Sequence, residues 1–302
     1  MALRRVGRAD LLKKYVASIL AAGTLWGFMG LFVRLLGEHD IGSTGAVLLR
    51  CALAAALFAI TILFRDRKLF RVRLRDLWCF LGTGLCSLLF FTWCYFTSMD
   101  YLDLSTAAIL LYTAPSIVIV LSRFVFREKL TPAKLTALVL AFAGCCLVSG
   151  VGSGTRLPTA GLLYGLGAGF GYALYSIFAR LAMNRGYHSI TVNFYTCLLA
   201  ALGAAVIWGL EPVPVMVSSG GTFALCLCAA AVTCYLPYLL YTYGLSGVET
   251  GKASIMASVE PVVATLVGVL VFHERLTIGG LCGTLLVLGA IVLLNVRRKV
   301  TP

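Results

Sequence analysis

Two nine-residue stretches decide the fold of this chain, because each places a proline near the middle of a long apolar run. Residues 253–261 read ASIMASVEP, and residues 107–115 read AAILLYTAP. A proline removes a backbone hydrogen bond from a helix, and a carboxylate in mid-membrane is costly unless it is paired or wetted. The first stretch contains such a carboxylate, Glu260, where the second has Ala114. The pattern predicts two interrupted helices, one of which holds an acid.

The composition places the chain in a membrane. Of its 302 residues 60% are hydrophobic and 12% are charged, which leaves too little polar surface for a soluble protein of this size. The net charge of +13 could suggest a nucleic-acid partner. However, Lys and Arg lie in short segments between apolar runs, without a basic domain that has interleaved aromatic residues. We therefore predict a lipid-embedded protein with no nucleic-acid partner.

Ten apolar runs are long enough to cross about 30 Å of hydrocarbon, so we predict ten transmembrane helices. They cover residues 15–36, 44–64, 77–99, 104–125, 132–149, 160–182, 189–209, 221–244, 250–272 and 277–296. Basic residues concentrate in 1–14, 65–75, 123–134 and 297–302, with Arg156 and Arg275 as exceptions. Because basic loops stay inside, both termini are expected to be cytoplasmic.

The chain contains an internal repeat. An offset of 146 residues aligns Pro115 with Pro261, and it aligns the F-x-E-x-L-T block at 126–131 with the one at 272–277. Residues 15–150 and 160–296 would then each hold five helices, an odd number, so the second repeat must be inverted in the bilayer. Inverted repeats are the usual plan of secondary transporters, whose binding site lies near the midplane.

The two proline-then-acid blocks resemble the EamA family of the drug/metabolite transporter superfamily. One block runs from Ala114-Pro115 to Glu128, and the other runs from Glu260-Pro261 to Glu274. The resemblance covers about residues 15 to 296. It implies an inner-membrane carrier in which spans 1–4 and 6–9 surround a central cavity and spans 5 and 10 are peripheral. It also implies a small-molecule substrate, often an exported amino acid, without identifying it.

Glu260 and Arg50 are the charged candidates for the binding site. Glu260 lies about ten residues into its span, or ~15 Å deep, deeper than any other of the twelve acidic residues. It could bind a substrate ammonium group or carry a coupling proton, or it could be a structural acid satisfied by Arg50 or by hydroxyls. Arg50 lies about six residues from the outer end of its span. It could pair with a substrate carboxylate or with Glu260, or it could snorkel to the headgroups.

Aromatic and polar side chains deep in other spans are the remaining candidates. Deep tyrosines need hydrogen-bond partners, and together they could line a wet cavity for a small polar, aromatic or cationic substrate. Alternatively, they could form interhelical hydrogen bonds that only stiffen the bundle. The predicted cavity residues, besides Glu260 and Arg50, are Trp26, Tyr112, Tyr172, Tyr175, Asn193, Tyr238 and Tyr241. Pro115 and Pro261 are the predicted hinges.

Two further patterns have structural interpretations. Glycines spaced four apart, as in Gly23-x-x-x-Gly27 and Gly161-x-x-x-Gly165-x-x-x-Gly169, predict close helix packing. The repeated acids Glu128 and Glu274 lie at span ends beside basic residues, so we interpret them as structural ion pairs or helix caps.

The sequence favours a transporter over an enzyme. His39, His188 and His273 are isolated, and the eleven cysteines fall in or beside apolar runs, where they act as small hydrophobic residues. We therefore expect no metal and no cofactor. Neither a G-x-S-x-G motif nor a phosphate-binding loop occurs. We expect a secondary transporter that exports an amino acid or a related amine by alternating access, with protons as the candidate coupling ion. A polytopic membrane enzyme, a receptor or a scaffold is the alternative, and the oligomeric state is left open.

Overall fold

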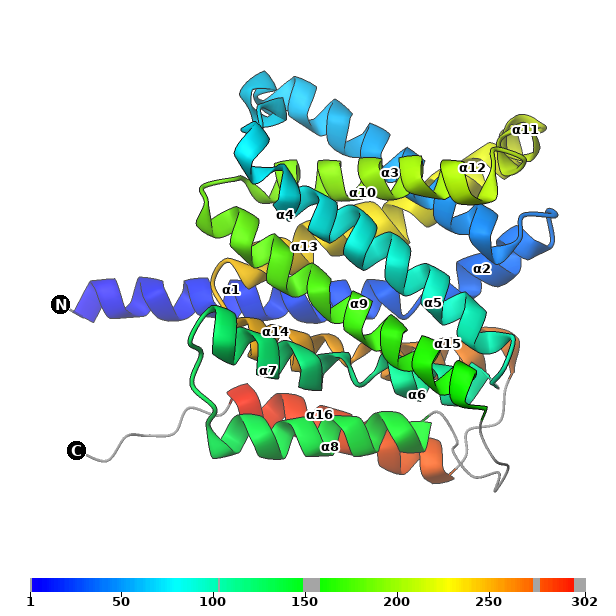
Figure 1. Cartoon of the computed structure of the whole chain (residues 1–302). Helices are drawn as coiled ribbons and strands as arrows, with labels where there is room; N and C mark the ends of the chain where they lie inside the picture. The colour runs from blue at the N-terminus through cyan, green and yellow to red at the C-terminus, as the bar shows by residue number, and fades with distance from the viewer. Residues whose placement is uncertain (1, 103, 149–157, 274–277, 296–302) are drawn as a thin grey trace.

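The computed structural model describes residues 2–102, 104–148, 158–273 and 278–295, and within these ranges it has helices and turns but no strand (Figure 1). The tail 297–302, the two exceptional arginines at 156 and 275, and Glu274 lie outside the described residues. The elements of the first repeat are α1 (Ala2–Trp26), α2 (Met29–Gly37), α3 (Ser43–Arg65), η1 (Arg67–Phe70), η2 (Leu74–Asp76), α4 (Leu77–Leu81), η3 (Gly82–Leu89), α5 (Phe90–Met99), α6 (Leu104–Leu111), α7 (Ala114–Val125) and α8 (Pro132–Val148). Those of the second repeat are α9 (Thr159–Asn184), α10 (Ser189–Trp208), α11 (Pro212–Val217), α12 (Gly220–Ala230), η4 (Ala231–Tyr235), α13 (Leu236–Leu245), α14 (Thr250–Ala257), α15 (Glu260–Phe272) and α16 (Ile278–Asn295).

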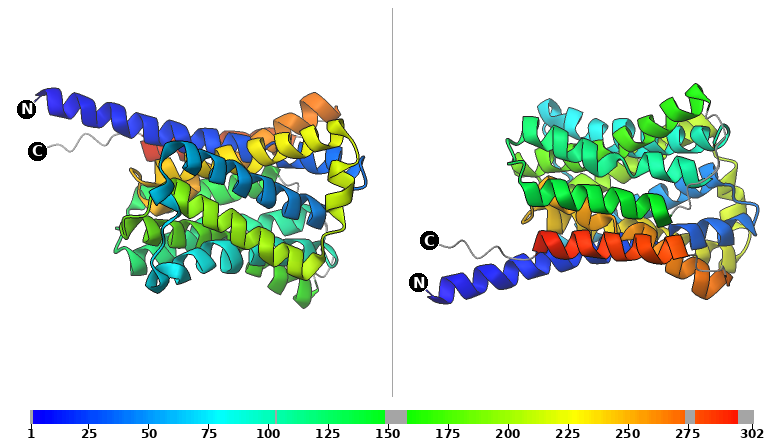
Figure 2. Two further views of the ribbon diagram at one scale, coloured as in Figure 1. Left: turned by 90° about the horizontal axis from the view of Figure 1, so that it is seen from above. Right: turned by 90° about the horizontal axis from the view of Figure 1, so that it is seen from below.

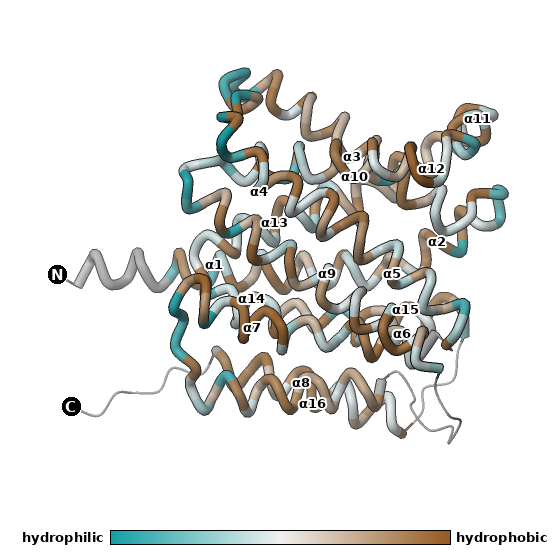
Figure 3. Tube along the Cα trace, viewed as in Figure 1, coloured by the Kyte–Doolittle hydropathy of each residue, from teal (hydrophilic) through white to brown (hydrophobic). Residues whose placement is uncertain are grey.

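Most of the helical segments are long and apolar enough for a membrane. Among the described residues, eight continuous or nearly continuous helices qualify as spans, and two shorter apolar helices cover Pro132–Leu147 and Ile278–Leu294. Hydrophobic residues dominate along the helices, and hydrophilic ones gather at the turns that join them (Figure 3). The all-helical membrane fold is therefore confirmed, whereas ten complete crossings stay a prediction.

The backbone repeats its irregularities at the offset found in the sequence. The gap of residues 112–113 between α6 and α7 corresponds to the gap of residues 258–259 between α14 and α15. The left-handed conformations of Arg127 (φ 56°) and His273 (φ 54°) correspond in the same way. The π-helical turns η3 and η4 also fall in equivalent regions. Independent matches in unusual backbone geometry support the two-repeat architecture.

Both prolines lie just after a helix break. Pro115 and Pro261 lie in the first turns of α7 and α15. A proline is tolerated there because the first N–H groups of a helix have no intrahelical partner. The predicted interruptions are therefore present, and each one starts a new helix at the residue before the proline.

One interruption has no counterpart in the other repeat. The helix of the first span breaks at Gly27–Phe28, between α1 and α2, whereas α9 runs without a break. Gly27 lies against the start of α15, where a Cβ would come within 2.9 Å of the Glu260 carbonyl oxygen. The asymmetry of the chain is thus concentrated beside Glu260.

Glycines bring helices of one repeat against the breaks of the other. A Cβ at Gly23 on α1 would lie 2.9 Å from the carbonyl oxygen of Ala257, which ends α14. Its repeat partner Gly169 on α9 lies against the end of α6, where a Cβ would be 2.7 Å from the Leu110 carbonyl oxygen. The predicted glycine packing surfaces are confirmed at both positions.

Gly169→Ala is expected to destabilise the protein by about 1–3 kcal/mol, because the methyl group would overlap backbone that cannot move independently. Gly289→Ala is the matched control, since a Cβ at Gly289 meets nothing within 4 Å. That control should be neutral or slightly stabilising, as alanine favours helix. Thermal unfolding in detergent measures both. Equal unfolding temperatures would contradict the packing role of Gly169.

Two helices, α8 and α16, lie apart from the central group of helices (Figures 1 and 2). α8 and α16 lie side by side at one edge of the bundle (Figures 1 and 2), and α16 packs against α8 through Gly144, where a Cβ would lie 2.7 Å from the Gly283 carbonyl oxygen. The start of α1 and the end of α16 lie at the same end of the bundle (Figure 1). The same end also holds four connections, α3–α4, α7–α8, α9–α10 and α13–α14 (Figure 1). We call it the basic end, because most of the charged residues there are Lys and Arg.

Candidate functional site

A cavity of about 650 Å³ lies between the two repeats. It reaches from the exposed side chains of Ser43 and Arg34, at the end of the bundle opposite the basic end, to Glu260 at the start of α15. Its size is within the usual range of small-molecule sites. Lining residues come from α1, α2, α3, α5, α6, α9, α12, η4, α13 and α15, whereas none comes from α8, α10 or α16.

Glu260 is held at the floor of this cavity by a helix terminus and a hydroxyl. It is the first residue of α15, where the helix dipole favours a negative charge. The hydroxyl of Tyr172 donates a hydrogen bond to its Oε2 at 3.2 Å. Glu260 forms no ion pair with Arg50 or with any other described residue. A hydroxyl therefore satisfies part of this carboxylate, and its cavity side has room for a ligand.

Arg50 is buried in the wall of the same cavity rather than extended to the lipid headgroups. Its side chain is 7% exposed, so the snorkelling alternative is wrong. One terminal nitrogen donates to the sulfur of Met29, and Nε has no hydrogen-bond partner. The distance along the sequence from the helix end allowed snorkelling, but burial depends on the neighbouring helices.

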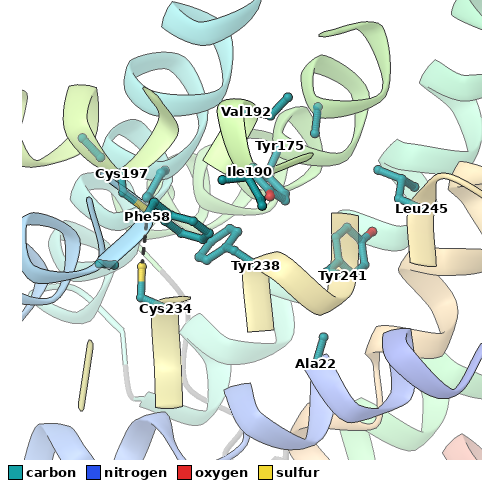
Figure 4. Close-up of a cluster of buried hydrophobic side chains, with 14 of the residues drawn as sticks. Ala22, Phe58, Tyr175, Ile190, Val192, Cys197, Cys234, Tyr238, Tyr241 and Leu245 are labelled. Atoms are coloured by element: carbon teal, nitrogen blue, oxygen red, sulfur yellow. Dashed lines mark hydrogen bonds between the residues drawn. The ribbon is translucent and has the colours of Figure 1, made fainter. Parts of the chain in front are cut away.

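Trp26 joins the aromatic residues of the cavity. Its ring centroid lies 6.4 Å from that of Tyr172 and 5.4 Å from those of Tyr238 and Tyr241. Tyr238 and Tyr175 meet edge to face at 4.8 Å. Tyr175, Tyr238 and Tyr241 belong to the largest buried cluster, which also contains Cys197 and Cys234 (Figure 4). The structure thus brings together aromatic residues from α1, α9 and α13.

The predicted site residues divide between two cavities. Trp26, Arg50, Tyr112, Tyr172, Tyr238, Glu260 and Pro261 line the large one. A second cavity of about 20 Å³, room for a single water molecule, is lined by Tyr175, Tyr241 and Pro115 and shares Trp26, Tyr172 and Tyr238. Asn193 lines neither cavity.

Asn193 instead fixes the orientation of Tyr175 from behind. It is fully buried, accepts a 2.7 Å hydrogen bond from the Tyr175 hydroxyl and donates one to Thr242 at 3.0 Å. For this pair, the interhelical hydrogen bond considered from the sequence is observed. Its position on α10, which contributes no residue to the large cavity, explains why it does not line that cavity.

Several lining residues were not expected from the sequence. Phe91 and Tyr95 on α5, Thr233 in η4 and Met29 on α2 all face the large cavity. Tyr95 could have been found, since the repeat offset aligns it with Tyr241. Thr233 and Met29 carried no such signal, because they face the cavity owing to the π-helical turn and the break after α1.

The basic end of the bundle is closed by a buried carboxylate. Glu128 follows α7 and accepts hydrogen bonds from the backbone N–H groups of Thr250 (2.6 Å) and Gly251 (3.2 Å) at the start of α14. Lys134, only 2% exposed, lies 3.2 Å from Glu128 and 3.0 Å from Glu249. The sequence left an ion pair or a helix cap as alternatives for Glu128, and the structure shows both contacts. We call Glu128, Lys134 and Glu249 the basic-end latch, because they tie α7 and α8 of the first repeat to α14 of the second.

Further contacts close the same end. Arg180 on α9 donates to the carbonyl oxygens of Leu245 and Val248, the latter at 3.3 Å. Asp76 pairs with Arg185 at 3.3 Å and accepts a hydrogen bond from the Tyr187 hydroxyl at 2.7 Å. The cavity therefore approaches one end of the bundle, while polar contacts within the second repeat and between the two repeats cover the other.

Comparison with known proteins agrees with this architecture. The EamA-like transporter family matches residues 13–150 and again residues 159–296. An uncharacterized transporter of Archaeoglobus fulgidus is 28% identical over 279 residues, covering 92% of this chain and 94% of that protein. The uncharacterized inner membrane transporter YicL of Salmonella typhimurium is 22% identical, with coverages of 95% and 97%. A crystal structure described only as that of a protein has a TM-score of 0.77 at 15% identity, covering 93% and 96%, which supports the fold alone.

These matches define the class of the protein. A helical membrane bundle with a family domain present twice and a cavity between the two copies is a multi-pass membrane transporter. The chain belongs to the EamA-like transporter family.

Proposed function

We propose that the protein is a secondary transporter that exports a small metabolite, an amino acid or a related amine, across the plasma membrane by alternating access. The cavity carries this proposal. It is large enough for such a molecule, reaches the carboxylate of Glu260 at a mid-span helix break, and lies opposite an end closed by the basic-end latch. Such an arrangement is expected of a carrier open to one side only.

The proposed topology has ten crossings and both termini in the cytoplasm. The two shorter apolar helices, α8 and α16, would complete the ten as thinner peripheral spans. The basic end would face the cytoplasm, since positively charged loops are retained there. The cavity would then open outward, and the basic-end latch would be the closed cytoplasmic gate.

The helix breaks at 112–113 and 258–259 are the proposed hinges. Each break lacks continuous i→i−4 hydrogen bonds, so α6 and α14 can tilt relative to α7 and α15. Because Gly23 and Gly169 lie against these breaks, movement of one repeat would be transmitted to the other. Opening of the basic end would require the Glu128 contacts to α14 to separate.

Purified protein in liposomes tests the proposal. Efflux of a preloaded panel of labelled amino acids and amines, with and without a pH gradient, is expected to show saturable flux of at least one compound. A pH gradient that drives uphill movement would support proton coupling. Hydrolytic turnover without flux would favour a membrane enzyme, and binding without flux would favour a receptor.

Tyr238→Ala is expected to weaken the apparent substrate affinity by roughly tenfold, because it removes an aromatic wall that touches Trp26. Tyr175→Phe is the contrasting variant. It removes only the hydroxyl that donates to buried Asn193, so it should lower stability by about 1–3 kcal/mol with little change in affinity. Concentration-dependent efflux and thermal unfolding separate the two effects. Loss of stability alone in Tyr238→Ala would make that residue a packing residue.

A further inference from the structure

Arg50 is a buried cation with almost no partner. A guanidinium has five N–H donors. Here Arg50 donates to the Met29 thioether and also contacts the Cys51 thiol, both of which are weak acceptors, and its Nε is buried without a partner. A buried charge without compensation is strongly unfavourable. The side chain is 93% buried and lines the 650 Å³ cavity.

No carboxylate in the described part of the chain forms an ion pair with this guanidinium, although Glu260 interacts with it electrostatically from across the same cavity. The ion pairs of the described residues involve other cations. The titratable groups that surround Arg50 are otherwise Cys51, Cys197, Cys234 and Tyr238. Thiols and phenols are neutral near pH 7. A carboxylate that pairs directly with Arg50 would therefore be that of a ligand in the cavity.

The cavity has two oppositely charged poles. Glu260 and Tyr172 form one pole, and Arg50 with neighbouring Tyr238 forms the other. Trp26 lies between the poles, because its ring contacts both Tyr172 and Tyr238. A ligand that lies along Trp26 can therefore meet both charges.

We propose that Arg50 is the carboxylate-binding group of the cavity, so that the transported molecule is a small zwitterion with its carboxylate at Arg50 and its ammonium group at Glu260. This assignment rests on the proposed transport function and narrows its substrate class. A simple amine would satisfy Glu260 but would leave Arg50 unpaired beside a second cation.

The chemistry of arginine fits this role. Its planar fork binds a carboxylate through two parallel hydrogen bonds, which a lysine cannot reproduce. Met29 is flexible and makes only a weak sulfur contact, so it can release the guanidinium when a stronger acceptor arrives. A zwitterion also brings no net charge into the cavity, since each of its ends meets an opposite charge.

Matched ligands test the assignment on the purified full-length protein. The probes are three trios of an amino acid, its decarboxylated amine and its deaminated acid. They are L-phenylalanine with phenethylamine and 3-phenylpropionate, L-leucine with isopentylamine and 4-methylpentanoate, and L-alanine with ethylamine and propionate. Binding is followed by tryptophan fluorescence, to which Trp26 contributes, and by thermal stabilisation. In at least one trio the amino acid should bind roughly 10- to 100-fold more tightly than either analogue.

Variants of Arg50 test whether this residue binds the carboxylate of the ligand. In Arg50→Gln the ratio of amino-acid to amine affinity should fall close to one, and Arg50→Lys should recover it only in part. In Glu260→Gln the ratio of amino-acid to deaminated-acid affinity should fall instead. Arg65→Gln, on the exposed end of the same helix, is the matched control and should keep both ratios.

Three results would overturn the assignment. They are an unchanged amino-acid to amine ratio in Arg50→Gln, equal binding of amino acid and amine by the wild type, and no binding by any member of the three trios. If Arg50→Gln fails to fold, the wild-type ratios and Arg50→Lys still decide. Absence of flux for every compound in liposomes would instead refute the transport proposal, because the binding ratios do not depend on flux.

Discussion

Glu260→Gln is expected to abolish transport, by roughly 100-fold or more, while the protein still inserts and folds. Glutamine has the shape of glutamate and can still accept the hydrogen bond of the Tyr172 hydroxyl, so packing at the start of α15 should persist. The variant removes the negative charge that would bind a substrate ammonium group or carry a coupling proton. Initial rates of efflux from liposomes at several pH values measure the effect, together with size-exclusion behaviour and thermal unfolding.

The pattern of residual activity distinguishes the two roles of the acid. Loss of all flux together with loss of ligand binding would assign Glu260 to the substrate, whereas flux that persists without pH dependence would assign it to proton coupling. Tyr172→Phe is the control, since it removes the hydrogen bond and keeps the charge, and it should reduce transport far less. Wild-type flux in Glu260→Gln at every pH would make this carboxylate purely structural.

Glu128→Ala is expected to lower the stability of the protein by about 3 kcal/mol, because it removes one partner of a buried ion pair. Lys134 would keep only the half-exposed Glu249, and the N–H groups of Thr250 and Gly251 would lose their acceptor. The substitution also cuts the link between α7 and α14, so the basic end should open more readily. Thermal unfolding and transport rates measure the two consequences.

Glu249→Ala provides the matched control for the latch. Glu249 pairs with the same lysine, but its side chain is 44% exposed, whereas that of Glu128 is 9% exposed. Solvent screening reduces the contribution of such a pair to less than about 1 kcal/mol. Hydrogen bonds from Lys134 and Lys252 outweigh burial and lower the pKa of Glu249, so this contact is present at neutral pH. Equal destabilisation by Glu128→Ala and Glu249→Ala would show that the burial of Glu128 does not increase its contribution to stability.

The pattern of residues in the sequence was sufficient to predict the two-repeat architecture. The offset between Pro115 and Pro261 predicted two related halves, and the structure repeats both the helix breaks and the left-handed residues at Arg127 and His273 at that offset. Proline and glycine constrain the backbone locally, so their effects can be read from the chain. The clustering of Trp26 with Tyr172 and Tyr238 was also predictable, because deep polar rings in several spans need a common interior.

Other features depend on how the helices pack. Asn193 and Tyr172 looked equivalent in the sequence, yet only Tyr172 lines the large cavity, since α10 lies behind α9 and α13. No proline near Trp26 predicts the helix break between α1 and α2, and α9 has no corresponding break. Glu128 could be identified as a cap from its position, but the helix that it caps is 122 residues away in the chain.

The sequence by itself determined that this is a helical membrane protein built from two repeats, with an acid at one of two helix breaks. Hydrophobic run length, proline position and the repeat offset are local properties of the chain, so no tertiary information was needed. Only the tertiary structure decided that Arg50 is buried in the wall of Glu260's cavity. Whether a long side chain reaches water or remains enclosed depends on the neighbours that surround it, and here α2, α10, η4 and α13 supply them.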